Sequence, residues 1–176
     1  MTTESAARGA FEDLLSELVR LCQIRFGQDF QGALLFGSTV SQLKPVTDID
    51  LIVAITGLPK NRRERLSLFS DIEVALKPKL DHMQARFGIR LELSEKLRTP
   101  DELSHFSPLY LDWVDHSRIL FERNAVFSDL IKKTAQYISE SGARRVQRGL
   151  KWYWILREGV TGDDEFEVGW KTPGAS

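Results

Sequence analysis

The most constraining feature of this sequence is a pair of short apolar segments that are separated by a polar loop. Residues 32–36 read GALLF and are followed at once by Gly37 and Ser38. Residues 48–55 read DIDLIVAI, in which two acids precede a wholly apolar run. Apolar runs of this length, bounded by Gly and Pro, are typical of buried strands. The pattern therefore predicts a sheet in which residues 48–55 form a central strand.

The rest of the chain shows both helical and strand patterns. Apolar residues recur at helical spacing over residues 11–22, in a helix that we expect to end near Gly27. The later elements are predicted, in chain order, as a helix over 61–87 that Pro78 kinks or breaks, a strand over 89–93, a helix over 100–115 disturbed at Pro108, a strand over 118–121, and two closing helices over 125–139 and 144–158. Few strands mixed with helices predict an α+β domain, a small mixed sheet of about four strands with helical cover.

Composition excludes several classes of protein. The 176 residues carry a net charge of -1, so no overall field points to nucleic acid or a membrane. The single cysteine, Cys22, permits no internal disulfide, and its amphipathic surroundings predict a packed thiol rather than a nucleophile. No signal peptide and no apolar run of about 20 residues is present. We therefore expect a cytoplasmic protein without a membrane segment.

Asp48 and Asp50 are the first candidate functional residues. Side chains two apart in a strand point to the same face, so these two carboxylates project together. Paired carboxylates repel each other unless a cation joins them, and Mg²⁺ prefers such hard oxygen ligands. The alternative is that Asp48 caps a turn and Asp50 is an exposed strand residue. That alternative fits poorly, because the strand that begins here has the pattern of one buried on both faces.

Gly37 and Ser38 are candidates for binding phosphate groups. A glycine allows the backbone to approach a polyphosphate closely, and backbone N–H groups and a serine hydroxyl donate hydrogen bonds to phosphate oxygens. The GxxxxGK[ST] loop of many kinases and ATPases is absent. Lys44, in the loop between the two apolar segments, is a further candidate for contact with a triphosphate. The alternative interpretation is a solvated loop lysine.

The segment LLFGSTVSQLKPVTDIDLIVA, residues 34–54, resembles the signature of the DNA polymerase β-type nucleotidyltransferase superfamily, particularly its minimal members. That signature is an apolar strand, Gly-Ser, a variable loop and acidic-x-acidic at the start of a strand. A third acid between apolar residues on a later strand completes it, and Leu91-Glu92-Leu93 matches this element. The resemblance covers residues 32–121. It implies a palm-like nucleotidyltransferase domain over 1–123, with a catalytic core at about 30–122.

The resemblance also implies a role for each residue of the motif. Asp48 and Asp50 are expected to bind two Mg²⁺ ions, or Mn²⁺ in their place. Glu92 is expected to bind the catalytic ion and to help deprotonate the acceptor, while Gly37 and Ser38 hold the β- and γ-phosphates. The expected reaction transfers an NMP, most plausibly AMP from ATP, to an acceptor hydroxyl and releases pyrophosphate.

The acceptor stays open at this point. A protein side chain, a small molecule or an RNA end all fit the chemistry, although the near-neutral charge disfavours a long nucleic acid. Small superfamily members resemble antitoxins that adenylylate a partner toxin, which is the alternative role. A further alternative is a non-catalytic module that retains the fold and captures a partner protein, or a second copy of the chain, through C-terminal helices over 124–160. Residues 161–176 are expected to form a flexible tail.

Three further signals concern charged and aromatic residues. The basic cluster at residues 61–65 (NRRER) contacts either phosphate or acceptor, or is simply a solvated helix face. Arg144, Arg148 and Lys151 share one face of the helix expected at 144–158, where the adjacent aromatics 152–154 pack in the core, stack on a base or dock a partner. Arg90 receives no role, because we expect it to point away from Glu92.

Overall fold

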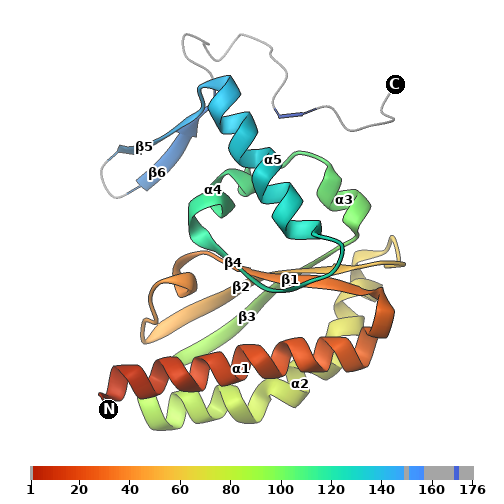
Figure 1. The fold of residues 1–176 in the computed structure, drawn as a ribbon. Helices are drawn as coiled ribbons and strands as arrows, with labels where there is room; N and C mark the ends of the chain where they lie inside the picture. Colours follow the sequence, from red (N-terminus) through yellow and green to blue (C-terminus); the bar gives the residue numbers. More distant parts are fainter. Residues whose placement is uncertain (1, 149–150, 157–168, 171–176) are drawn as a thin grey trace.

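The computed structural model describes residues 2–148, 151–156 and 169–170. A four-stranded sheet lies at the centre, and a separate two-stranded hairpin lies near the C-terminal end (Figure 1). The elements, in chain order, are α1 (Thr3–Phe26), β1 (Phe30–Phe36), β2 (Val46–Ile55), α2 (Arg62–Phe87), β3 (Arg90–Arg98), α3 (Pro100–Ser104), α4 (Leu109–His116), β4 (Ser117–Glu122), α5 (Val126–Ser141), β5 (Arg144–Arg148) and β6 (Lys151–Ile155). Short 3₁₀ turns follow α1 at Gly27–Asp29 and β1 at Ser38–Val40.

The four-stranded sheet is mixed, with the order β3-β2-β1-β4. β1 pairs antiparallel with both β2 and β4, whereas β2 and β3 run parallel. Parallel neighbours need a long crossover, and the 26-residue α2 supplies it. The predicted α+β class, with a small mixed sheet and helical cover, is confirmed, and residues 48–55 do lie in an interior strand.

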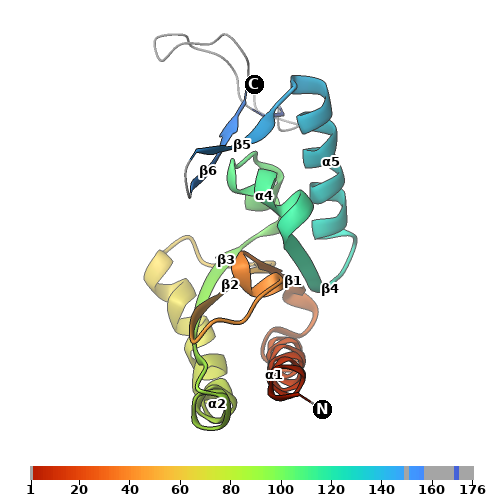
Figure 2. The ribbon, with the colours of Figure 1, turned by 90° about the vertical axis from the view of Figure 1, so that its left-hand side faces the viewer.

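The two faces of the sheet have different covers. Helices α1 and α2 lie side by side against one face, and α3, α4 and α5 lie on the other (Figures 1 and 2). Ile49, Leu51 and Val53 of β2 belong to the core beneath α1 and α2. Ile52 and Ala54 belong to the second core, beneath α4 and α5. Successive residues of β2 thus serve opposite cores, which explains why its sequence is apolar without interruption.

Cys22 lies fully buried in α1, among the core residues beneath the sheet. Burial raises the pKa of its thiol to about 12, because the charged thiolate loses its hydration. We therefore expect the native protein not to react with a disulfide reagent such as DTNB at neutral pH. Full reaction should appear only when denaturant exposes the side chain. Rapid labelling of the folded protein would contradict this burial.

Two helices differ from their predicted outlines. Of the kink or break predicted at Pro78, the break is excluded, because helix α2 continues through this residue and closes on Gly88 in the left-handed conformation. The helix expected over 100–115 is instead two helices, α3 and α4, separated by residues 105–108. Pro108 stands at the start of α4, a position where its missing N–H costs no helical hydrogen bond.

The helix predicted over 144–158 is wrong. Its described residues form β5 and β6, an antiparallel hairpin in which Arg145 pairs with Trp154. Val, Trp, Tyr and Ile favour extended backbone, and they outweigh the helical spacing of the basic residues. The indole of Trp154 donates a hydrogen bond to Asp112 Oδ1 at 3.0 Å, and Arg145 Nε lies 3.6 Å from the same oxygen. These contacts attach the hairpin to α4, so only α5 remains of the two predicted C-terminal helices.

The tail predicted at 161–176 lies outside the described residues, except for Gly169 and Trp170. Trp170 is half-buried, and its ring lies 5.1 Å from that of Phe106. Its indole donates to the carbonyl of Ser104 at 2.9 Å. This part of the C-terminal segment therefore packs against the loop that follows α3.

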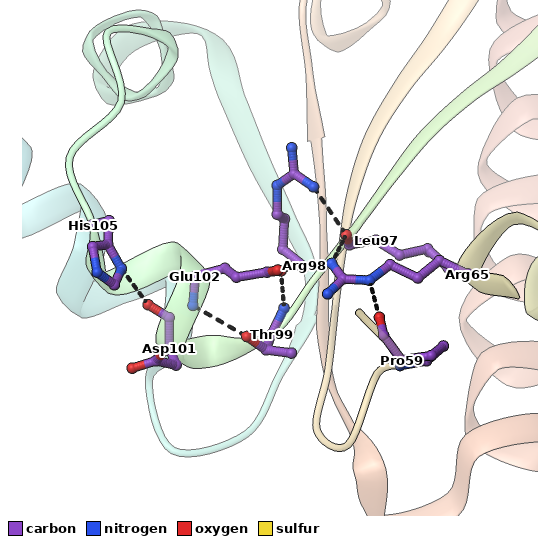
Figure 3. A network of polar contacts seen from close by, with 8 residues as sticks. All are labelled: Pro59, Arg65, Leu97, Arg98, Thr99, Asp101, Glu102 and His105. Carbon is purple, nitrogen blue, oxygen red and sulfur yellow. Dashed lines mark hydrogen bonds and ion pairs between the residues drawn. The ribbon is translucent and has the colours of Figure 1, made fainter. Parts of the chain in front are cut away.

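A capping box closes the start of α3, and it is linked to α2 (Figure 3). The Thr99 hydroxyl accepts from the Glu102 backbone N–H at 3.1 Å, and Glu102 Oε2 accepts from the Thr99 N–H at 3.0 Å. The same carboxylate accepts from Arg65 at 2.8 Å, and the Arg65 side chain is only 12% exposed. Glu102 therefore joins the start of α3 to the start of α2.

We expect Glu102→Gln to lower the free energy of unfolding by about 1 kcal/mol, after discounting for the partial exposure of the carboxylate. The hydrogen bond from Arg65 lowers the pKa of Glu102. A lowered pKa in the folded state stabilises the fold above the unfolded pKa of about 4.3 and loses that contribution as pH falls through the folded value. Urea unfolding at several pH values should show the gap between wild type and variant closing in acid. Asp101→Asn, one residue earlier, is the matched control and should change little.

Candidate functional site

The two acids of the motif lie together on β2. Asp48 and Asp50 alternate with Thr47, Ile49 and Leu51, which are buried towards α1 and α2. The carboxylates therefore project from the opposite face, called here the acid face, where Asp48 is exposed and Asp50 is half-buried. Helices α3 to α5 also lie on this side of the sheet.

The third acid lies on the neighbouring strand, beside Asp48. β2 and β3 pair in parallel register, with Asp48 opposite Glu92 and Asp50 opposite Ser94. Residues paired in register point to the same face, so all three carboxylates belong to the acid face. Glu92 is therefore a spatial neighbour of Asp48 although the two residues lie far apart in the sequence.

Arg90 lies on the same face as Glu92, and our expectation that it points away was wrong. Its guanidinium forms an ion pair with the Glu92 carboxylate. Residues two apart in a strand share a face, so the alternation itself predicts this contact. The ion pair partly neutralises Glu92, and both side chains are at least half exposed.

The carboxylates fit Mg²⁺ in kind, because each offers hard oxygen ligands. They are not gathered around one point: among the described residues, no three His, Cys, Asp or Glu side chains are placed to hold a metal ion. Glu92 is engaged with Arg90 in this arrangement. The donor set for a divalent cation is thus present on one face, with its third member held aside by an arginine.

Gly37 brings the end of β1 against the same acids. Its φ of +80° is left-handed, and a Cβ at this position would lie 2.9 Å from Asp50 Oδ2. Phe36, the preceding residue, pairs in register with Asp50. Only glycine permits this close approach of backbone to carboxylate. The exposed Ser38 follows directly and begins the 3₁₀ turn, so Gly37 and Ser38 lie beside the acid face as the motif requires.

The loop that follows Ser38 is held by α1. The Arg8 guanidinium donates to the carbonyls of Thr39 at 3.2 Å and Ser41 at 2.8 Å. The Thr47 hydroxyl accepts from the Lys44 backbone N–H at 3.2 Å. The side chain of Lys44 is exposed. Nothing in the sequence around Arg8 marks it for this task, because it resembles any polar residue on the outer face of an amphipathic helix.

Lys96 is a second residue that the motif does not identify. It follows Glu92 and Ser94 along the acid face of β3 and pairs in register with Ile52. Its ammonium lies 5.3 Å from the centre of the Phe36 ring, and Phe36 is the register partner of Asp50. A positive charge therefore lies on the same face as the acids, opposite Ile52, which is two residues after Asp50 on β2. The sequence does contain a signal for Lys96, because it stands four residues after Glu92 and alternate side chains of a strand share one face.

A small cavity continues the acid face beyond Lys96. It has a volume of about 190 Å³, and Ile52 and Lys96 form its floor on the sheet. Phe106 and Tyr110, from the segment that joins α3 to α4 and from α4 itself, line its helical side. The cavity thus combines a cation with aromatic rings, and its lining begins at Ile52, two residues after Asp50 on β2.

No protein-family model matches this chain. A protein of Methanocaldococcus jannaschii with the provisional name of a protein adenylyltransferase is 27% identical over 124 residues, which cover 69% of this chain and 78% of that protein. In the described part of the chain, no helix has the length and apolarity that crossing a bilayer requires.

Solved structures give weaker similarities. A chain of a toxin–antitoxin structure with AMP-PNP is 17% identical, with a TM-score of 0.44 and coverage of 71% of this chain and 87% of that chain. A chain from a complex of a tri-AMPylated HEPN toxin of Shewanella oneidensis with an MNT antitoxin is 15% identical, with a TM-score of 0.40 and coverage of 73% and 87%. The motif order and its acids on neighbouring parallel strands agree with the resemblance to the polymerase β-type nucleotidyltransferase superfamily, and the relative from Methanocaldococcus carries the name of an enzyme that transfers a nucleotide.

Proposed function

We propose that this protein is a Mg²⁺-dependent nucleotidyltransferase that transfers AMP from ATP to a hydroxyl group of a protein. The observation that carries the proposal is the register of β2 and β3, which sets Glu92 opposite Asp48 on the face that also bears Asp50. The protein acceptor is supported by the relative named as a protein adenylyltransferase. ATP as donor and a single buried cysteine agree with a cytoplasmic location.

Each residue of the motif has a separate role in the proposed reaction. Asp48 and Asp50 would hold the metal, while the Gly37 backbone and Ser38 hydroxyl donate hydrogen bonds to the β- and γ-phosphates. Glu92 accepts the proton of the acceptor hydroxyl, whose oxygen forms a bond to the α-phosphorus as the bond to pyrophosphate breaks. Mg²⁺, when bound, lowers the pKa of that hydroxyl and neutralises the leaving pyrophosphate. The protein's own contribution is mostly placement and charge compensation.

Arg90 fits this scheme as the partner that holds Glu92 before substrates arrive. The exposed ion pair is held only loosely, so Glu92 is available to a competing cation. Once released from Arg90, the Glu92 carboxylate would be free to accept the proton of the acceptor hydroxyl.

The proposal is tested by following the label from nucleotide to acceptor. Purified protein is incubated with Mg²⁺, each α-³²P-labelled NTP in turn and fractions of a cell lysate. We expect label from ATP on a protein band, and the identity of that band tells whether the acceptor is a toxin. Label on a small molecule or RNA would overturn the protein acceptor. Absence of label with every nucleotide and fraction, from folded protein, would favour the non-catalytic partner-binding module.

A further inference from the structure

A sizeable cavity lies outside the acid cluster. It occupies about 460 Å³ between the start of α2 and the end of β3. Its cationic lining residues are Lys60, Arg62, Arg65, Lys96 and Arg98. Two carboxylates, Glu95 and Glu102, also line this basic cavity. Arg62 and Arg65 belong to the basic cluster at 61–65, for which the sequence allowed either contact with phosphate or acceptor or a solvated helix face.

The positive charge of the basic cavity is only partly neutralised. Arg65 is paired with Glu102 (Figure 3). Within the described chain, no ion pair engages the side chains of the other four cations. Burial raises the pKa of the Glu95 carboxyl, and Glu73 on α2 adds to the increase. Even with Glu95 and Glu102 both charged, the five cations outnumber the two carboxylates. The wall therefore keeps an excess of positive charge.

The helix dipole of α2 strengthens the positive electrostatic potential of the cavity. Lys60 and Arg62 stand at the N-terminal end of the 26-residue α2, where the helix dipole is already positive. Cations at this end repel the dipole and each other, at a cost that an anion in the cavity would remove. Arg98 donates a hydrogen bond to the Leu97 carbonyl, which fixes its guanidinium at the edge strand of the sheet (Figure 3).

We infer that the basic cavity binds an acidic peptide segment. Its volume exceeds that of one small anion, and its lining contains no aromatic ring on which a nucleobase would stack. Glu95 and Glu102 stand among the cations, an arrangement that repels a densely charged phosphate chain. Carboxylates spaced along an extended peptide are able to meet single cations instead.

The basic cavity also adjoins the acid face. Lys96, Arg98 and Glu102 line both this cavity and the smaller one that begins at Ile52. A segment held by the larger cavity therefore has a route past Lys96 towards Asp50. That the segment belongs to the protein acceptor rests on the proposed function, whereas its binding to the cavity does not.

Binding is measured without nucleotide, by fluorescence anisotropy of a short fluorescein-labelled peptide of alternating glutamate and serine. We expect Arg62→Glu to weaken binding by about tenfold or more, since it reverses a cation of the wall. The matched control is Arg63→Glu, which makes the same charge change at the next residue, an exposed one outside the cavity lining. It should weaken binding less than about twofold. A glutamate in the first turn favours the helix, so both variants should fold.

The Asp48→Asn/Asp50→Asn protein separates this inference from the proposed function. It should bind the peptide as wild type does, even though it transfers no nucleotide. Failure of nucleotide transfer in the wild type would leave the peptide result intact. Equal weakening by Arg62→Glu and Arg63→Glu would show a general charge effect and overturn the cavity. Binding of an oligothymidylate in place of the peptide, lost in Arg62→Glu, would overturn the peptide as its ligand.

Discussion

Asp50→Asn is expected to lower the rate of AMP transfer by about 10³-fold or more, and Asp48→Asn by a similar factor. Asparagine keeps the size of the side chain but removes the negative charge that a divalent cation needs. Both acids lie on one face of β2, so each substitution removes one of the two charges from that face. Transfer to the labelled acceptor at saturating ATP and Mg²⁺ is the measurement.

The same substitutions should leave the fold intact. Removal of one of two neighbouring like charges relieves repulsion, so the free energy of unfolding in Mg²⁺-free buffer should stay equal or rise. Asp13→Asn is the control, because Asp13 is an exposed acid on α1, beyond the other face of the sheet. Transfer that survives in both site variants at near wild-type rate would remove Asp48 and Asp50 from the chemistry.

Gly37→Ala is the second substitution with a large expected effect. The added methyl group would lie 2.9 Å from Asp50 Oδ2, so the carboxylate has to move. A displacement of about 1 Å at a reacting centre lowers a rate by about 10²-fold. The left-handed φ of +80° adds a conformational cost of about 1 kcal/mol. Transfer rate and thermal unfolding are measured together.

Gly57→Ala isolates the steric part of this effect. Gly57 has a similar φ of +69°, but a Cβ there would meet no atom within 4 Å. It should therefore show a comparable loss of stability with unchanged transfer. If Gly57→Ala lowers transfer as much as Gly37→Ala does, the contact between Gly37 and Asp50 is not what matters.

Most of the sheet was predictable because its strands coincide with short apolar runs in the sequence. The run DIDLIVAI forms β2, and the shorter run that ends at Phe36 forms β1. Gly88 closes α2, and the capping box at Thr99 opens α3, as their residue types predict. The hairpin of β5 and β6 was missed, since Arg144, Arg148 and Lys151 fit a helical face equally well. Its aromatic residues, with Gly149 between the two strands, were the contrary signal.

The candidate site was predictable in its residues but not in its arrangement. Local pattern shows that Asp48 and Asp50 share a face, whereas only strand pairing shows that Glu92 stands opposite Asp48. The support from Arg8 and the charge of Lys96 depend on contacts between elements far apart in the chain. The basic cavity could not be predicted from the sequence for the same reason, because its walls come from α2 and β3 and neither wall alone carries a motif.

The parallel pairing of β2 with β3 also bears on how the protein acquires its site during folding. A hairpin such as β1 and β2 closes over a short loop, but Glu92 reaches Asp48 only after the whole of α2 has crossed the sheet. Closing so long a loop costs more entropy and is slower. We therefore expect Asp48 and Asp50 to be in place before Glu92 joins them. Activity on refolding should accordingly return with the docking of α2 and β3, later than the first β-structure.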